Sequence, residues 1–155
     1  RPNQIFAVAL DHSPLSPTAR KTVLDICTRE LVTPKGLRSL SPKSGGYNPI
    51  FAGPQQRDRC YYQGTAWPWL MGFYLEAYLR VYKRSGLSYI ERQLIGFDEE
   101  MSYHFIGTLP ELFDGDPPFH GRGAFAFAMS VSGILRAERL LEKYNENNPY
   151  KEETI

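Results

Sequence analysis

Apolar residues recur at helical spacing in five stretches, which we predict to be helices. These are residues 3–10, 17–32, 65–83, 88–105 and 123–144. The clearest begins after Ser16, a suitable N-cap, with Pro17 in the first turn. Residues 34–63 show no strong periodicity, and a segment this long predicts a functional loop or a small hairpin. Residues 107–122 are dense in turn-forming residues and predict a loop.

The first, third and fifth of these helices are apolar around most of their circumference, whereas the second and fourth carry one apolar stripe. A helix that is apolar on every side must be enclosed, and a striped helix lies at a surface. We therefore predict an all-α fold in which inner and outer antiparallel helices alternate, as in a toroid of α-hairpins. Five helices cannot close a ring, so residues 1–155 would form an arc or part of a longer toroid.

In such an arrangement the inner helices run in the same direction, so the segments that lead into them lie at one rim. These segments are residues 1–4, 57–64 and 107–122. They hold most of the unusual polar and aromatic side chains of the chain. The predicted functional site therefore lies at this rim.

Composition excludes several classes of function. The chain has 18 Lys and Arg against 17 Asp and Glu, a balance that argues against a nucleic-acid binder. No apolar run approaches the roughly 20 residues of a membrane span. The three His are dispersed without metal-ligand spacing, so we expect no metal and no other cofactor. The two Cys are expected to be reduced and structural, which favours a cytoplasmic protein. The tail from about residue 145 is polar and is expected to fray.

Three carboxylates lie close together in the predicted loop at 107–122: Glu111, Asp114 and Asp116. Asp114 precedes a glycine and Asp116 precedes two prolines, so structural roles in turns are favoured for both. Glu111 is not a turn-forming residue and lies between apolar neighbours. A carboxylate in such surroundings is a candidate general base.

Aromatic residues make up 14% of the chain, and several gather at residues 57–69. Two Trp flank a Pro there, beside Tyr61 and Tyr62, and together they form a rigid surface on which a sugar could stack. Gln63 and a neighbouring Arg could bind hydroxyl groups. The alternative is a hydrophobic plug that closes the end of a helix, and the pattern does not decide between the two.

Five motifs occur in the same order in the C-terminal glucosidase domain of glycogen debranching enzymes. They are RPNQIFAVAL, HSPLS, GLRSLSP, RDRCYYQGTAWPW and PELFDGDPPFHGRG. The chain thus resembles that domain from Arg1 to about Arg139. The resemblance implies a partial (α/α)6 toroid, as in glucoamylases. It also implies removal of α-1,6-linked glucose stubs from α-glucans such as glycogen or limit dextrin.

The same resemblance implies roles for individual residues. Glu111 stands at the position of the general base in the family's Glu-x-Phe-Asp-Gly motif. Arg122 matches the Arg before the last inner helix. The expected substrate-binding positions are Asn3, Gln4, Tyr61, Gln63, Trp67, Trp69 and Arg122.

The chain also departs from the family pattern. Tyr62 stands where the family usually has His, and residues 119–124 differ from its His-x-Pro-Arg-Gly-Cys sequence. Phe127 and Met129 replace a Gln and a Trp on the last inner helix. These differences leave the general base in place but bear on substrate preference.

Glycoside hydrolysis normally requires two carboxyl groups, and the family's general acid is an Asp upstream of the matched region. The resemblance therefore implies the C-terminal portion of a glucosidase, inactive without the missing N-terminal half of the toroid. Apolar surface left bare by an incomplete ring predicts self-association. The alternatives are a non-catalytic α-glucan-binding or structural module, or a related glucosidase of glucoamylase or trehalase type that acts on another linkage.

Overall fold

The computed structural model describes residues 1–103 and 106–146, and helices dominate them. The α-helices are α1 (Phe6–Ala9), α2 (Pro17–Glu30), α3 (Arg57–Cys60), α4 (Trp69–Tyr82), α5 (Leu87–Glu100) and α6 (Ala128–Glu146). Short 3-10 helices are η1 (Pro2–Ile5), η2 (Pro54–Gln56) and η3 (Lys83–Gly86). The strands are β1 (Val32–Thr33), β2 (Gly36–Arg38), β3 (Ala66–Trp67), β4 (Leu112–Phe113) and β5 (Gly121–Arg122).

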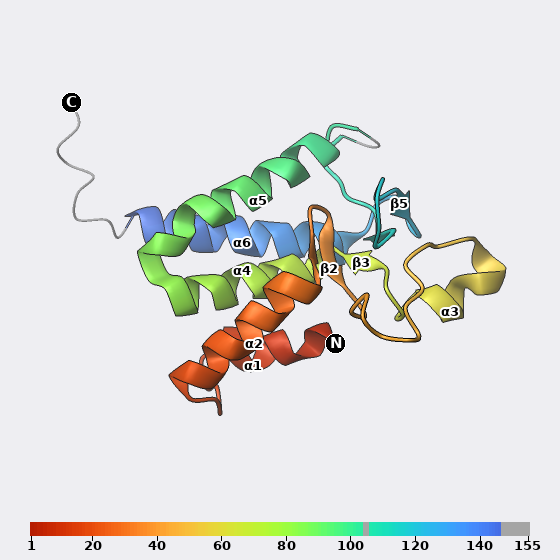
Figure 1. Cartoon of the computed structure of the whole chain (residues 1–155). Helices are drawn as coiled ribbons and strands as arrows, with labels where there is room; N and C mark the ends of the chain where they lie inside the picture. The colour runs from red at the N-terminus through yellow and green to blue at the C-terminus, as the bar shows by residue number, and fades with distance from the viewer. Residues whose placement is uncertain (104–105, 147–155) are drawn as a thin grey trace.

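Helix α4 is the centre of the structure (Figure 1). It packs against both α1 and α6, while α2 packs on α1 and α4, and α5 packs on α6. Tyr74 and Met71 on α4 are completely buried. The helix-rich character of the chain is the predicted one, whereas the predicted alternation of inner and outer helices in a toroid stays a prediction.

Two glycines allow α4 and α6 to approach closely. A Cβ atom on Gly72 would overlap the carbonyl oxygen of Gly133. A Cβ atom on Gly133 would lie 2.6 Å from the Cα atom of Trp69. The backbones of the two helices are therefore in direct contact at the start of α4.

Helix α2 begins as predicted. The Ser16 side chain accepts a hydrogen bond from the backbone N–H of Ala19, at 3.3 Å, and Pro17 occupies the first turn. On its inner face Leu24 and Cys27 are fully buried. The predicted end of the helix is also close, because α2 stops at Glu30.

The prediction of an all-α fold needs correction, because five short strands form an antiparallel sheet in the order β1-β2-β3-β4-β5. Residues 65–68, expected to be helical, instead provide β3, and Pro68 precedes α4. Residues 123–127 are not helical either, since α6 starts at Ala128. The β1–β2 hairpin falls at the edge of the segment for which a loop or small hairpin was predicted.

The sheet lies where α4 and α6 begin (Figure 1). Strand β3 pairs with β2 on one side and with β4 on the other. Gly36 has a φ of +144°, and a Cβ atom there would come within 2.6 Å of the backbone of Trp67. The sheet thereby brings the aromatic segment before α4 next to the segment that contains Glu111.

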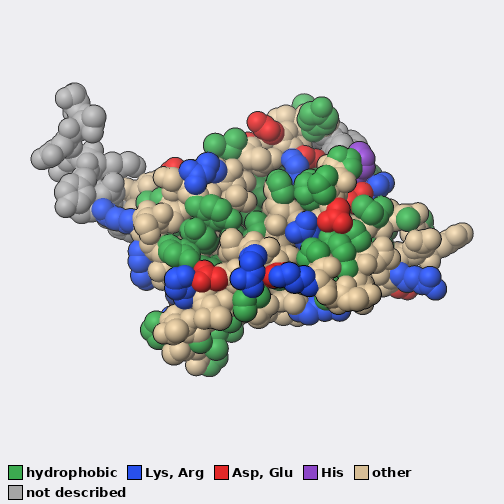
Figure 2. Space-filling model, in the orientation of Figure 1, with side chains coloured by type: hydrophobic (Ala, Val, Ile, Leu, Met, Phe, Trp, Pro, Cys, Tyr) green, Lys and Arg blue, Asp and Glu red, His purple; other side chains and the backbone are tan. Residues whose placement is uncertain are grey.

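The cysteines, the surface charges and the chain ends can also be compared with the predictions from sequence. Cys27 and Cys60 are free and buried, and burial raises the pKa of the Cys27 thiol to about 11, which fits a structural role. Lys and Arg side chains are interspersed with Asp and Glu on the face shown in Figure 2. In the described ranges no helix is both long and apolar enough to cross a membrane. The predicted helix at 88–105 ends at Glu100, and the tail expected to fray lies outside the described residues from 147 onward.

Candidate functional site

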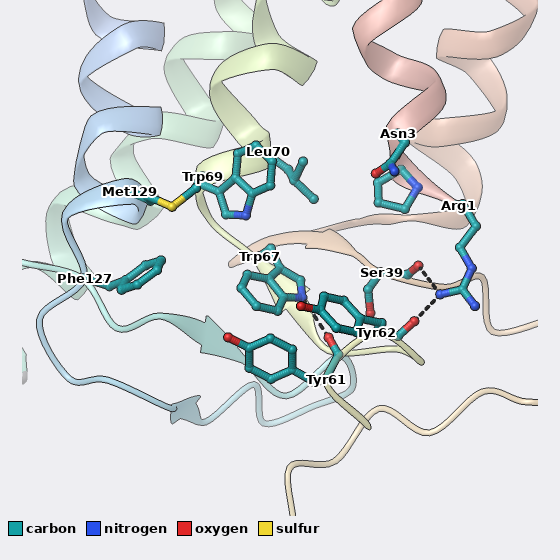
Figure 3. A pocket seen from close by; sticks show the side chains of 11 residues that line it. Arg1, Asn3, Ser39, Tyr61, Tyr62, Trp67, Trp69, Leu70, Phe127 and Met129 are labelled. Atoms are coloured by element: carbon teal, nitrogen blue, oxygen red, sulfur yellow. Dashed lines mark hydrogen bonds between the residues drawn. The ribbon is translucent and has the colours of Figure 1, made fainter. Parts of the chain in front are cut away.

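A hollow of about 540 Å³ opens where α1, α4 and α6 begin (Figure 3). Its lining comes from the residues before α1, from the segment before α4 and its first turn, and from the start of α6. The lining residues are Arg1, Pro2, Asn3, Ser39, Tyr61, Tyr62, Trp67, Trp69, Leu70, Phe127 and Met129. Two of the three predicted rim segments thus contribute to it, whereas no residue of the third, 107–122, lines it.

Aromatic rings form most of one wall (Figure 3). The rings of Tyr61 and Trp67 meet edge to face, with their centroids 4.6 Å apart. The ring of Tyr62 is nearly parallel to that of Trp67, at an angle of 4° and a centroid distance of 6.1 Å. Trp67 is only 7% exposed, whereas Tyr62 is 62% exposed. Trp67 therefore closes the end of the helix layer, and Tyr62 offers an open ring face to a ligand.

The carboxylate of Glu111 is held by two donors immediately behind this wall. The Tyr61 hydroxyl donates a hydrogen bond to Oε1, and the backbone N–H of Ala124 donates one to Oε2 at 2.9 Å. The backbone N–H of Glu111 in turn donates to the carbonyl oxygen of Ala124 at 2.7 Å. Glu111 is 9% exposed, and no ion pair between described residues involves it. Tyr61 thus connects the hollow to this carboxylate.

Gly123 fixes the loop that faces Glu111. Its φ is +72°, a left-handed conformation that favours glycine. A Cβ atom on Gly123 would overlap Oε2 of Glu111. The glycine is therefore needed both for the turn and for the position of the carboxylate.

The two other carboxylates of this segment have structural partners. Asp114 is 1% exposed and accepts hydrogen bonds from Arg122, from Nη2 at 2.8 Å and from Nε at 3.0 Å. Asp116 accepts from the hydroxyl of Tyr47 at 2.8 Å, and burial together with this bond raises the pKa of Tyr47 to about 12. The guanidinium of Arg122 is engaged by Asp114 and does not line the hollow, so its expected substrate contact stays a prediction.

The amide side chains that were expected to bind substrate differ in their placement. Asn3 lines the hollow, but Gln4 and Gln63 do not. Gln4 donates to the carbonyl oxygen of Arg1 at 2.8 Å, and the side-chain oxygen of Gln63 accepts from Arg1 Nη2 at 3.1 Å. Arg1 also donates to the carbonyl oxygens of Ser39 and Tyr62 (Figure 3). The two glutamines therefore hold Arg1 at the mouth of the hollow.

Sequence reasoning missed part of the lining. Nothing in the pattern pointed to Ser39, which reaches the hollow through the β2–β3 pairing. Phe127 and Met129 were noted only as departures from the family pattern, and that departure was the signal that could have found them. Tyr62 was noted both as a departure and as part of the aromatic surface at residues 57–69, and it does line the hollow. In residues 1–103 and 106–146 no group of three or more His, Cys, Asp or Glu is placed to hold a metal ion.

Comparison with known proteins gives two findings. A family model described as amylo-alpha-1,6-glucosidase matches residues 1–136. A stretch of 87 residues is 32% identical to the glycogen debranching enzyme of Saccharomyces cerevisiae. That match covers 50% of this chain and 6% of the yeast enzyme, so the chain spans only a small part of this relative.

Proposed function

Because the chain belongs to the amylo-α-1,6-glucosidase family, we propose that it is part of a glycoside hydrolase that cleaves α-1,6-glucosidic branch linkages in glycogen-type α-glucans. Glu111 is the general base of this proposal. The observation that supports it most directly is the Glu111 carboxylate, which Ala124 and Tyr61 hold directly behind Tyr61, a residue that lines the aromatic hollow. The proposal places the protein in the cytoplasm, where glycogen would be its substrate.

The proposed reaction is hydrolysis with inversion. A water molecule attacks the anomeric carbon, Glu111 takes its proton, and the bond to the leaving oxygen breaks. From the described part of the chain each oxygen of Glu111 accepts one hydrogen bond, which leaves lone pairs for water. Trp67, Trp69 and Asn3 would contact the glucose ring, with Gln4, Gln63 and Arg122 supporting the site.

A second carboxyl group is needed to protonate the leaving oxygen, at roughly 6.5–9.5 Å from the base in inverting enzymes. None of the described residues that line the hollow carries a carboxyl group. Asp114 and Asp116, the nearest in sequence, are engaged by Arg122 and Arg38. We therefore assign the general acid to a part of the enzyme outside this chain, and we expect the chain alone to be inactive on glycosides.

The proposed architecture follows from this assignment. Helices α1, α4 and α6 would belong to the inner ring of a partial (α/α)6 toroid, and α2 and α5 to its outer ring. Phe125 (64% exposed), Met129 (49%) and Leu135 (52%) leave apolar surface on and before α6. This surface would be covered by the N-terminal half of the toroid or, in its absence, by self-association. Elution of the chain as a monomer in size-exclusion chromatography would contradict self-association.

Hydrolysis of α-D-glucosyl fluoride tests the role of Glu111 as general base without requiring the general acid. Fluoride departs without protonation, so this substrate needs only a base, which takes the proton of the attacking water. We expect the chain to hydrolyse it to β-glucose, observable by proton NMR, and to leave isomaltose and limit dextrin intact. Glu111→Gln should lower the rate by about 100-fold or more. Glu91→Gln, on the exposed side of α5, is the matched control.

Two results would change the proposal. Equal rates for the wild type and Glu111→Gln on the fluoride would remove Glu111 as the base. Robust hydrolysis of isomaltose that depends on Glu111 would show that an acid does lie inside this chain.

A non-catalytic α-glucan-binding module is the second candidate, because the lining of the hollow contains both tryptophans of the chain and no carboxylate. Intrinsic tryptophan fluorescence therefore reports on this hollow. Titration with isomaltose or maltooligosaccharides should give a saturable change. Saturation without any turnover of the fluoride would favour the binding module.

A further inference from the structure

We propose that Tyr61 is a positioning residue that holds the carboxylate of Glu111 through its hydroxyl group, rather than a residue that binds glucose. This inference rests on the proposed function of Glu111 as a base. It changes the role expected for Tyr61 from sequence, because its hydroxyl donates a hydrogen bond to Oε1 of Glu111 although the residue also lines the hollow.

The two donors on Glu111 together define the position of its carboxylate. Tyr61 supplies a donor to Oε1, and the backbone of Ala124 supplies one to Oε2. Among the described residues no Lys or Arg forms an ion pair with the carboxylate, so its protein contacts are hydrogen bonds from neutral donors. The carboxylate is thereby fixed in place and still able to act as a base.

Tyr61 is itself fixed by its neighbours. Its carbonyl oxygen accepts hydrogen bonds from Thr65 Oγ1 at 2.9 Å and from Trp67 Nε1 at 3.2 Å. Its ring is packed against the ring of Trp67, and the guanidinium carbon of Arg57 lies 4.7 Å from the ring centroid. A phenol with its backbone and ring both held can impose a position on the carboxylate that it contacts.

The protonation state of Tyr61 supports this role. Burial raises its pKa above the ordinary value, and the hydrogen bond to Glu111 raises it further, whereas Arg57 lowers it. The hydroxyl therefore keeps its proton at neutral pH and stays a donor to Glu111.

The contact can be tested without any glycosidase activity. Tyrosine labelled with ¹³C at Cζ gives one NMR signal per residue, and the signal missing in Tyr61→Phe identifies Tyr61. We expect this signal to be displaced in Glu111→Gln, because the charged acceptor of the Tyr61 hydroxyl is then replaced by a neutral amide. It should keep its wild-type position in Glu91→Gln. A Tyr61 signal that is the same in the wild type and Glu111→Gln would overturn the inference.

Kinetics on α-D-glucosyl fluoride distinguish positioning from sugar binding. Tyr61→Phe removes one hydrogen bond to a charged group, so we expect kcat to fall about 10-fold or more while KM is unchanged. An increase in KM with unchanged kcat would show that the hydroxyl binds sugar, and would also overturn the inference. If the fluoride is not hydrolysed in a Glu111-dependent way, the proposed function fails, and the NMR comparison of the wild type with Glu111→Gln still decides whether Tyr61 holds Glu111.

Discussion

Replacement of Gly123 by alanine tests whether the backbone of this loop determines the position of Glu111. The φ of +72° disfavours any residue with a Cβ atom, which costs about 1–2 kcal/mol. The new methyl group would also overlap Oε2 of Glu111. The carboxylate must then move and lose its hydrogen bond from Ala124, which adds about 1–2 kcal/mol. We expect a total destabilisation of about 2–4 kcal/mol.

Gly107→Ala is the matched control for this prediction. Gly107 has nearly the same φ, +76°, but nothing lies within 4 Å of the position of its Cβ atom. Gly107→Ala therefore has the energetic cost of the left-handed backbone without a steric overlap. The effect of alanine on the entropy of the unfolded chain is the same in both variants and cancels in their comparison.

The assay is urea unfolding followed by circular dichroism, with the Cζ signal of Tyr61 as a local probe. The free energies of unfolding of the two variants should differ by about 1–2 kcal/mol, which is roughly 0.5–1 M in urea midpoint. Only Gly123→Ala should shift the Tyr61 signal. Equal destabilisation of the two variants with an unshifted Tyr61 signal would refute the reasoning.

Three further changes should have defined effects on stability. Asp114→Ala leaves the guanidinium of Arg122 without its buried partner and should lower the free energy of unfolding by about 3 kcal/mol in urea titrations. Gly72→Ala places a methyl group against the carbonyl of Gly133 and should cost about 1–3 kcal/mol, measured in the same way. Glu30 has its pKa lowered from 4.5 to about 2, chiefly by Lys43. Its stabilising contribution is therefore present above pH 4.5 and lost as the pH falls toward 2, so Glu30→Gln should weaken the pH dependence of the urea midpoint in that window.

Each of these changes has a control in the chain. Asp116→Ala removes a carboxylate that is 41% exposed and should cost less than about 1 kcal/mol. Gly96→Ala, within α5, meets nothing closer than 3.8 Å and should stabilise the protein by roughly 0.5–1 kcal/mol. Glu91→Gln should leave the acid limb of the stability profile unchanged. Loss of stability at Gly96 equal to that at Gly72 would contradict the close contact of α4 with α6.

The helices could be predicted because their signals are local. The cap at Ser16, the stripe of α2 and the all-round apolar character of α4 each lie within one stretch of sequence. The sheet could not be predicted in the same way. Its strands have two or three residues, too few for a periodic pattern, and β3 pairs with a strand more than forty residues later in the chain.

In the candidate site, too, contacts between residues far apart in the sequence could not be predicted. Motif resemblance singled out Glu111 and Tyr61 individually, but their contact joins positions 50 residues apart and depends on the β3–β4 pairing. The two glutamine side chains expected at the sugar instead contact Arg1: Gln63 accepts a hydrogen bond from its guanidinium because folding brings the two together, and Gln4 donates to its carbonyl oxygen. The sequence therefore pointed to candidate residues, but it could not predict their hydrogen-bond partners, which depend on tertiary contacts.

The glycine contact between α4 and α6 has a consequence for how this hollow could change. Since main chain touches main chain at Gly72 and Gly133, beside Trp69, the spacing of these two walls does not depend on the size of the side chains that face inward. Substitution of Phe127 or Met129 by a larger or more polar residue would then leave the distance between α4 and α6 unchanged. Under the proposed function, preference for one sugar over another could then change through substitution of the residues that line the hollow, while its width stays the same.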